Sequence, residues 1–242
     1  MSDARTSEAD VPGLVIRPAS SPDELDVLRA TMDSVWGPEI VPPRNLLRGL
    51  AIGGACLLVA FVDERPVGFA LGWMGWNGGV HFHSHQVGVV AAQRGSGVGA
   101  ALKMAQRDLC LARGVTEMRW TFDPLLWANA RFNLVRLGAG VVDFFPHCYG
   151  DRRDAFNTGE ITDRIEVSWR LDVPVGAAML EPSADDEVIE IPRDYPVLRT
   201  TQPDLAARWR SQVGGALAEV FGGGGKVLGL SSHGYVVRRS GD

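Results

Sequence analysis

Residues 81–99 read HFHSHQVGVVAAQRGSGVG, in which a histidine-bearing run ending in β-branched residues leads into three glycines at alternate positions. The run over residues 81–90 predicts a strand, because β-branched residues suit a pleated backbone. From residue 97 to residue 113, apolar residues recur every three or four positions, which predicts a helix that Gly114 ends. The glycine-rich segment therefore joins a strand to a helix.

The sequence on either side of this segment predicts further strands and helices. A helix begins at Ser21 and Pro22, since Ser is a favoured N-cap and Pro suits the first helical turn. Another helix is expected at residues 128–137. Strands are expected at residues 14–17, 55–62, 66–76, 115–122, 141–149 and 164–171. The order β-α-β-β-β-α-β-α-β-β predicts an α/β fold in which helices cover a mixed sheet.

The chain is expected to have three parts. Residues 1–12 are polar and are expected to form a disordered leader, and residues 13–171 hold the α/β domain. Residues 172–242 form a C-terminal extension of one helix and several strands, the strands at residues 187–191, 226–230 and 235–238. The apolar face of its helix consists of Leu205, Trp209, Val213, Leu217 and Phe221. At about 70 residues the extension is marginal as an independent domain, so it is expected to pack on the domain or on a partner subunit in a homodimer.

The chain has 242 residues, of which 45% are hydrophobic and 22% are charged. This is the composition of an ordinary globular protein. Lys and Arg number 24 and Asp and Glu 29, and the net charge of −5 argues against partners bound through nucleic-acid phosphates or anionic membranes. The first residues do not resemble a secretory signal, and no apolar run is long enough to predict a membrane span. Cys56, Cys110 and Cys148 are widely spaced, which favours free thiols over a disulfide framework or a cysteine zinc site. These features predict a cytoplasmic protein that acts on small molecules.

The glycine-rich segment has the composition of a phosphate-binding loop. Glycines let the backbone approach a ligand closely, and the amides and dipole at a helix start attract anions. A P-loop requires Gly-Lys followed by Ser or Thr, whereas Gly99 is followed by Ala100. The dinucleotide fingerprint is met formally by Gly95, Gly97 and Ala100, but it belongs in a parallel βαβ unit. A Rossmann-like nucleotide-binding protein therefore stays open as an alternative, as does a glycine turn that binds nothing.

The same segment carries a family resemblance. Val89, followed by Arg94-Gly95-Ser96-Gly97-Val98-Gly99 and a helix, resembles motif A of the GNAT acyltransferases, whose pattern is Gln/Arg-x-x-Gly-x-Gly/Ala. The predicted order of strands and helices is also similar to the GNAT fold, over residues 14–171. The runs at residues 83–85, 121–125 and 129–134 resemble a bacterial subgroup of predicted acetyltransferases, some of which acylate amino acids with donors larger than acetyl.

The resemblance implies that acetyl-CoA, or another acyl-CoA such as succinyl-CoA, is the co-substrate. Its pyrophosphate would bind the backbone amides of Arg94, Gly95, Ser96, Gly97, Val98 and Gly99. The pantetheine arm would pair with the backbone of Val87 and Val89 like an added strand. Asn129, at the start of the second helix, matches a family position that contacts the coenzyme.

Three of the five histidines, His81, His83 and His85, occupy alternate positions of one predicted strand and hence one of its faces. They could form a structural cluster, bind a metal, or act as a base and proton relay. No further ligand is spaced nearby, so no metal is expected. An imidazole with a pKa near 6.5 can accept the proton that an attacking amine must lose. His83 and His85 are similar to the histidine pair of arylalkylamine N-acetyltransferases in their interval to motif A, which implies the relay.

Two further residues are candidates for the site. Asp123 ends a predicted strand before Pro124 and is expected to orient an imidazole or the substrate ammonium, although Asp-Pro is also a common turn. Many GNAT enzymes carry a Tyr in the second helix that protonates the leaving thiolate, but that position is Leu134 here. Tyr149, expected at a strand end, is the candidate substitute or a structural residue. Helix amides and water can also stabilise the thiolate.

Taken together, these features predict an acyl-CoA-dependent N-acyltransferase. The expected reaction moves an acyl group from coenzyme A to the amine of a small molecule, such as an amino acid, by direct attack in a ternary complex. Holding both reactants in one site can lower the barrier by about 7–11 kcal/mol. A coenzyme-binding module without catalysis is the contrasting expectation.

Overall fold

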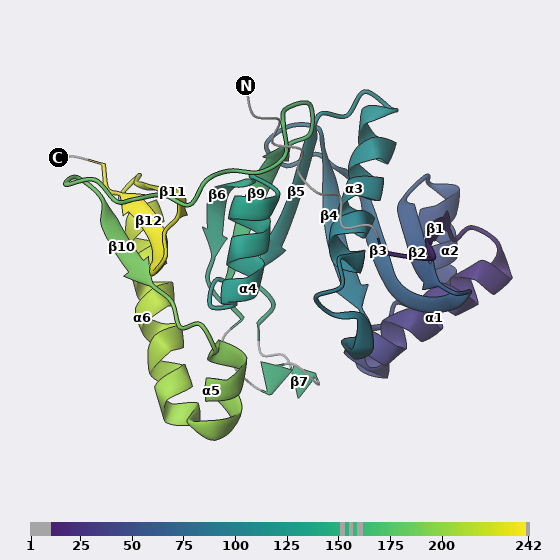
Figure 1. The fold of residues 1–242 in the computed structure, drawn as a ribbon, viewed down its shortest axis with the longest axis horizontal. Helices are drawn as coiled ribbons and strands as arrows, with labels where there is room; N and C mark the ends of the chain where they lie inside the picture. Colours follow the sequence, from purple (N-terminus) through teal and green to yellow (C-terminus); the bar gives the residue numbers. More distant parts are fainter. Residues whose placement is uncertain (1–10, 151–152, 155–156, 159–161, 241–242) are drawn as a thin grey trace. The chain divides into compact units, whose positions relative to one another are not determined.

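The computed structural model describes residues 11–150, 153–154, 157–158 and 162–240 (Figure 1). Nearly all of the expected leader, residues 1–12, lies outside these residues. Contacts divide the chain into two units, and the main break falls between Thr116 and Glu117. The C-terminal extension belongs to the second unit, together with Glu117–Arg153 and the residues from Asn157 to the extension. The expected domain boundary between residues 171 and 172 stays a prediction.

In the first unit, four strands pair antiparallel in the order β1-β2-β3-β4. They are β1 (Leu14–Pro18), β2 (Cys56–Val62), β3 (Arg65–Gly75) and β4 (His81–Val89). The helices are α1 (Pro22–Trp36), α2 (Arg44–Ile52) and α3 (Val98–Leu111), with short 3-10 turns η1 (Pro38–Ile40) and η2 (Ala91–Gln93). The predicted strands and helices of this unit are confirmed. Helix α2 was not expected from the sequence, because it has only nine residues and begins without a side-chain cap; the same holds for the seven-residue helix α5 (Tyr195–Thr201) of the second unit.

Helices cover both faces of these four strands. Leu57 and Val59 of β2 pack with α1 and α2 in a core that also includes Phe69 of β3. The neighbour of Phe69, Gly68, points to the opposite face, where α3 lies against β3. A Cβ at Gly68 would lie 3.2 Å from Leu102 Cδ1, so the glycine allows close packing of α3. The side to which a β4 residue points therefore decides which helices it meets.

A β-bulge interrupts β4 at the histidines. Leu71 of β3 pairs with Gln86 and Gly72 pairs with Ser84, which leaves His85 as the extra residue between them. A bulge of this kind bends the strand and re-aims its side chains. The bulge therefore breaks the alternation that predicted all three histidines on one face of the strand. Which of their rings lie close together follows from the distances between the ring centroids, given below.

In the second unit, three strands pair antiparallel in the order β5-β9-β6 and three others in the order β10-β12-β11. The strands are β5 (Glu117–Phe122), β6 (Gly140–Phe145), β9 (Arg164–Arg170), β10 (Glu187–Glu190), β11 (Lys226–Leu230) and β12 (Gly234–Arg238). The short strands β7 (Arg153–Asp154) and β8 (Asn157–Thr158) pair with each other. The helices are α4 (Trp127–Ala130), the π-helix η3 (Arg131–Arg136), α5 (Tyr195–Thr201) and α6 (Pro203–Gly222). The α/β class and the predicted order of the main elements are confirmed.

Two predicted boundaries in this unit need correction. The single helix expected at residues 128–137 is α4 followed by the π-helical η3. The strand expected at residues 141–149 ends at Phe145. Pro146 has no amide hydrogen to continue the strand ladder, and His147 has a positive φ of 50°.

The predicted face of α6 is also wrong in part. Its buried residues are Ala206, Arg210, Val213, Leu217 and Val220. Val213 and Leu217 agree with the prediction, whereas Leu205, Trp209 and Phe221 are only partly buried. The pattern of apolar residues could not reveal this face, because an arginine occupies its centre.

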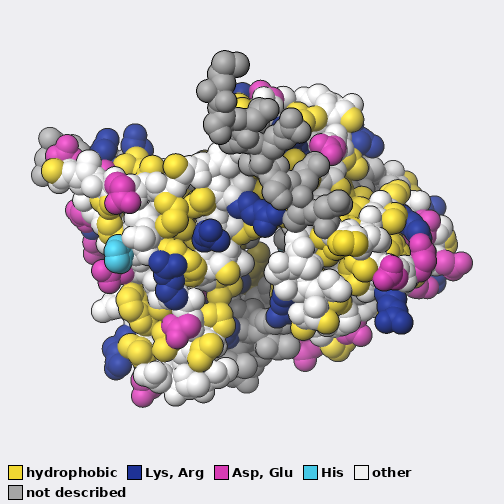
Figure 2. Space-filling model, viewed as in Figure 1, with side chains coloured by type: hydrophobic (Ala, Val, Ile, Leu, Met, Phe, Trp, Pro, Cys, Tyr) yellow, Lys and Arg dark blue, Asp and Glu magenta, His cyan; other side chains and the backbone are white. Residues whose placement is uncertain are grey.

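Charges are mixed on the face of the molecule that Figure 2 shows. Lys and Arg side chains lie among hydrophobic ones, and acidic side chains occur on the same face. Within the described part of the chain, no helix combines the length and apolar character that crossing a membrane requires.

Candidate functional site

The glycine-rich loop lies between η2 and α3 in the first unit (Figure 1). Gly95 and Gly97 have φ values of 80° and 106°, a left-handed backbone that residues with a Cβ rarely adopt. Gly97 caps α3, and the first bond of the helix joins Ala101 N to Gly97 O at 3.0 Å. The amides before Ala101 have no acceptor within the helix, as at every helix start. The loop thus presents these amides and the positive end of α3 to an anion.

Two side chains of the loop are bound to its own backbone. Ser96 Oγ donates to Gln93 O at 2.7 Å, and Arg94 Nε donates to Val89 O at 3.4 Å. At the next glycine, Gly99, a Cβ would have Val89 Cγ2, at 3.7 Å, as its nearest atom outside the helix. The start of α3 therefore has room for a side chain at Gly99.

The backbone groups of Val87 and Val89 point away from β3. Val90 N donates to Val67 O of β3 at 2.9 Å. Backbone groups of successive strand residues alternate between the two edges of the strand. Gly88 therefore faces β3 with Val90, whereas Val87 and Val89 face the other edge. That orientation is the one a pantetheine arm would need.

His83 and His85 lie beside Trp73 of β3. The Trp73 ring centroid is 5.5 Å from that of His83 and 4.8 Å from that of His85, and the two imidazoles are 5.9 Å apart. Trp73 also packs against the core beneath α1 and α2, which places this group on that face of the sheet. Burial lowers the pKa of His83 to about 4, with smaller contributions from the positive charges of His85, His81 and Lys103. His83 is therefore neutral at pH 7.

His81 has a different environment. It is 4% exposed, and its Nδ1 lies 2.9 Å from the carbonyl oxygen of Gly79 in the β3–β4 turn. Because a carbonyl can only accept, Nδ1 donates in this bond. His81 thus stabilises the turn.

A buried polar cluster on the α3 face of β4 was missed by the sequence analysis. Lys103 Nζ donates to Ser84 Oγ and Ser84 Oγ donates to Gln106 Oε1, both at 2.7 Å. None of the three residues is more than 4% exposed. Burial holds the pKa of Lys103 well below its ordinary value. The cluster joins α3 to the strand that carries His83 and His85, and a lone lysine in a helix gave no signal of this.

In the second unit, Asp123 follows β5 directly, and its carboxylate is held by Arg210 of α6. Arg210 donates two hydrogen bonds to it, of 2.8 Å and 2.6 Å, and Arg164 Nη1 lies 4.0 Å away. The side chains of Arg210 and Asp123 are 7% and 14% exposed. Burial alone would lower the pKa of Arg210, but the hydrogen bonds and charge of Asp123 raise it above its ordinary value. The expected contact of Asp123 with an imidazole or ammonium stays a prediction.

Tyr149 and Asn129 both have exposed side chains in the second unit. Tyr149 lies in the turn after β6 rather than at a strand end, so that part of the prediction is wrong. Its backbone N donates to Thr162 Oγ1 at 3.0 Å, and the Arg164 guanidinium lies 5.2 Å from its ring centroid. Asn129 lies in α4. Their roles as thiolate acid and coenzyme contact stay predictions.

Comparison with known families places the glycine loop in a known domain. Residues 26–132, which include β4, the loop and α3, match the model of the Acetyltransferase (GNAT) family. Residues 26–132 belong to the GNAT superfamily. This membership supports acyl transfer from coenzyme A to an amine as the type of reaction. No curated protein matches the GNAT chain in sequence.

Solved structures share the GNAT fold with this chain at low identity. The ribosomal-protein-S18-alanine N-acetyltransferase of Escherichia coli has 12% identity and a TM-score of 0.54, over 66% of this chain and 96% of its own. Arabidopsis thaliana Naa50, in complex with the bisubstrate analogue CoA-Ac-MVNAL, has 16% identity and a TM-score of 0.52, over 64% and 97%. YncA, a putative acetyltransferase from Salmonella typhimurium with its cofactor acetyl-CoA, has 18% identity and a TM-score of 0.51, over 66% and 95%.

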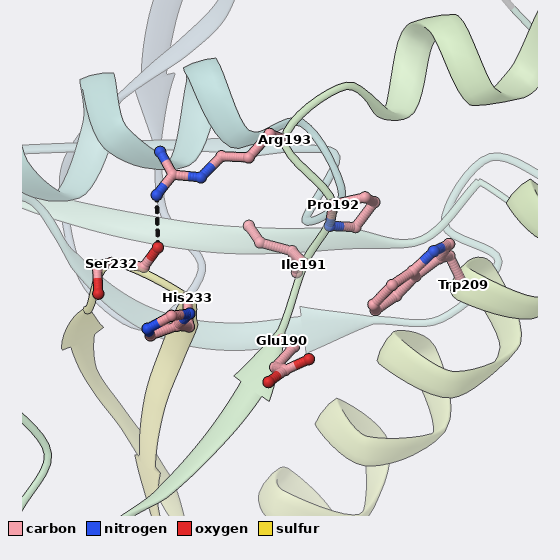
Figure 3. Close-up of a pocket in the computed structure, with 7 residues that line it drawn as sticks. All are labelled: Glu190, Ile191, Pro192, Arg193, Trp209, Ser232 and His233. Atoms are coloured by element: carbon pink, nitrogen blue, oxygen red, sulfur yellow. Dashed lines mark hydrogen bonds between the residues drawn. The ribbon is translucent and has the colours of Figure 1, made fainter.

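A pocket of 380 Å³ lies in the extension of the GNAT chain (Figure 3). It is lined by Glu190, Ile191, Pro192, Arg193, Trp209, Ser232 and His233. None of the predicted site residues lines it, so it is separate from the predicted site. Among the residues that the structure describes, no group of three or more His, Cys, Asp or Glu could hold a metal ion.

Proposed function

We propose that this GNAT chain transfers an acyl group from coenzyme A to the primary amine of a small molecule, with amino acids as the favoured acceptors. The donor is acetyl-CoA or a larger acyl-CoA such as succinyl-CoA. The observation that carries the proposal is the pair of left-handed glycines, Gly95 and Gly97, at the start of α3. They lie in the segment that matches the family model.

The coenzyme would bind along the loop and the Val87–Val89 part of β4, on the side that faces away from β3. Its pyrophosphate would accept hydrogen bonds from the amides of residues 94–99, where the helix dipole favours negative charge. Of these amides, Arg94 N and Ser96 N also donate to Ala91 O and Gln93 O, each at 3.3 Å. The pantetheine arm would pair with Val87 and Val89, whose backbone groups face away from β3. Asn129 would contact the coenzyme from α4.

The chemistry needs a proton acceptor near the attacking amine. The amine nitrogen attacks the thioester carbonyl carbon, a C–N bond forms, and the C–S bond breaks as the thiolate leaves. The amine proton would pass to His83 and His85, which lie side by side against Trp73. A pKa of about 4 keeps His83 deprotonated at neutral pH but makes it a weaker base than an ordinary imidazole, so His83 would pass the proton on rather than hold it. Tyr149 would protonate the thiolate, and Asp123, held by Arg210, would orient an imidazole or the substrate ammonium.

The proposed anion site is tested by Gly99→Asp with Gly99→Asn as the matched control. Asp at this position suits the positive end of α3 and has room, so the protein should fold. The added carboxylate would repel the pyrophosphate, so calorimetry should find acetyl-CoA binding weakened at least tenfold in the Asp variant and much less in the Asn variant. Equal affinities in the two variants would place the phosphates elsewhere.

The substrates are tested by a screen that detects the free thiol. Acetyl-CoA and succinyl-CoA would be offered with amino acids, small amines and short peptides. The peptides are included because two structural neighbours are named for a ribosomal protein and a peptide-derived analogue. Turnover only with peptides would contradict the small-molecule acceptor. Tight binding of NAD with none of coenzyme A would favour the nucleotide-binding alternative.

A further inference from the structure

The C-terminal extension contacts both ends of the helical segment that follows β5. This segment, residues 127–136, consists of α4 and η3 and carries Asn129. Its N-terminal end follows the Asp123-Pro124 turn. Its C-terminal end leads into β6.

At the N-terminal end, two buried side chains of the extension hold the turn. Arg210 of α6 donates both of its hydrogen bonds to the carboxylate of Asp123. Tyr235 of β12, which is fully buried, donates from its hydroxyl to Pro124 O at 2.7 Å. A bidentate charged pair and a buried hydrogen bond fix both position and orientation.

A third side chain of the extension covers the first residue of α4. The guanidinium carbon of Arg193 lies 3.6 Å from the centroid of the Trp127 ring, within the range of a cation–π interaction. Arg193 also donates to the carbonyl of Ser232, and Figure 3 shows it extended toward that carbonyl. The cation is thereby held in place over Trp127.

At the C-terminal end, the extension binds the last carbonyls of η3. Gly176 N donates to Leu137 O at 3.2 Å, and Ala177 N donates to Val135 O at 2.8 Å. The last carbonyls of any helix lack partners within it. The backbone of the extension therefore supplies the donors that this helix end needs.

We propose that the extension is a positioning element of the transferase. It holds residues 127–136 at both ends and so fixes the place of Asn129 toward the coenzyme. Arg210 and Tyr235 are positioning residues, since they act through the turn and not on the coenzyme. The inference rests on the proposed function, in which Asn129 contacts coenzyme A.

The test compares Tyr235→Phe and Arg210→Lys with Arg239→Gln. The first variant removes one hydrogen bond, and the second keeps the charge but loses the two-pronged contact. Arg239 is the matched control, because it belongs to the same extension and forms exposed ion pairs with Glu187 and Glu219. Hydrogen exchange of peptides over residues 123–133 and calorimetry with coenzyme A would be measured on folded protein.

Tyr235→Phe should speed exchange in residues 123–133 and weaken coenzyme A binding about fivefold, the effect of one hydrogen bond. Arg239→Gln should change neither. Because Tyr235 acts through Asn129, the double variant Asn129→Ala/Tyr235→Phe should bind no more weakly than Asn129→Ala alone. The KM for the acyl-CoA should rise while the KM for the acceptor stays constant.

Three outcomes overturn the inference. They are unchanged affinity in both positioning variants, faster exchange without loss of affinity, and additive losses in the double variant. If Arg210→Lys does not fold, Tyr235→Phe decides alone. If the unmodified protein binds no coenzyme A, both the proposed function and the inference are overturned. If the unmodified protein binds coenzyme A, the variants test the inference alone.

Discussion

The environment of His83 changes what this imidazole can do. An ordinary histidine is half protonated near pH 6.5, whereas burial next to Trp73 and the other histidines lowers the pKa of His83 to about 4. Only the neutral form of His83 can accept a proton from an amine. Protonation of His83 should therefore not limit the rate until the pH falls toward 4.

Replacing both His83 and His85 with Gln tests the relay. Gln keeps polar volume but cannot accept the proton, so the rate at pH 7 should fall by about 10²- to 10⁴-fold while coenzyme affinity barely changes. The loss should shrink at high pH, because free amine is then abundant. It is measured from thiol release between pH 5 and pH 10. Full activity at pH 7, or an equal deficit at every pH, would favour a structural histidine cluster, and chelator-sensitive activity in the parent would revive a metal site.

At the scale of the element, helix α3 contributes both to the proposed anion site and to a buried polar contact with β4. Its first turn faces the proposed anion site, and its inner side carries Lys103, bonded to Ser84 of β4. In the folded state, burial holds the pKa of Lys103 well below its ordinary value of 10.5. In the unfolded chain Lys103 is protonated at pH 7. The free energy of unfolding should therefore increase as the pH rises toward 10.5, because the unfolded state then loses its extra proton.

Lys103→Met should make the protein more stable at pH 7. Met has a similar length and no polar group to remove from water on folding, and Ser84 Oγ keeps its bond to Gln106 Oε1. The advantage should shrink as the pH approaches 10.5. Denaturant unfolding at pH 7 and pH 9.5 measures it, with Lys226→Met on an exposed lysine as control. A Met variant that is less stable at both values would show that the buried ammonium stabilises the helix.

At the scale of the whole molecule, the extension is part of the second unit rather than an appendage. The residues that bind it to the Asp123-Pro124 turn are far apart in the sequence: Asp123 and Arg210 are separated by 87 positions, and Pro124 and Tyr235 by 111. Unfolding of the extension should therefore also unfold the turn.

Arg210→Met should cost about 3 kcal/mol of stability, because it removes the two charged hydrogen bonds to a mostly buried carboxylate and leaves Asp123 with only Arg164 at 4.0 Å and the amide of Leu125. The double variant Asp123→Asn/Arg210→Met removes that charge and should recover a large part of the loss. Denaturant unfolding of the parent, both single variants and the double variant gives the coupling. Additive effects would show that the ion pair contributes little.

The order of the main strands and helices followed from the sequence alone, except for the short helices α2 and α5, because caps, glycines and apolar spacing act within a few residues. The glycine loop at the start of α3 was predictable for the same reason, and its residues carried the family resemblance. The structure alone placed Arg210 and Lys103 in the interior, since a buried charge depends on a partner from another element. It also decided the bulge at His85, which depends on the register between β3 and β4. Local propensity determined which elements form, whereas contacts between distant residues determined which charges are buried and where the side chains of β4 point.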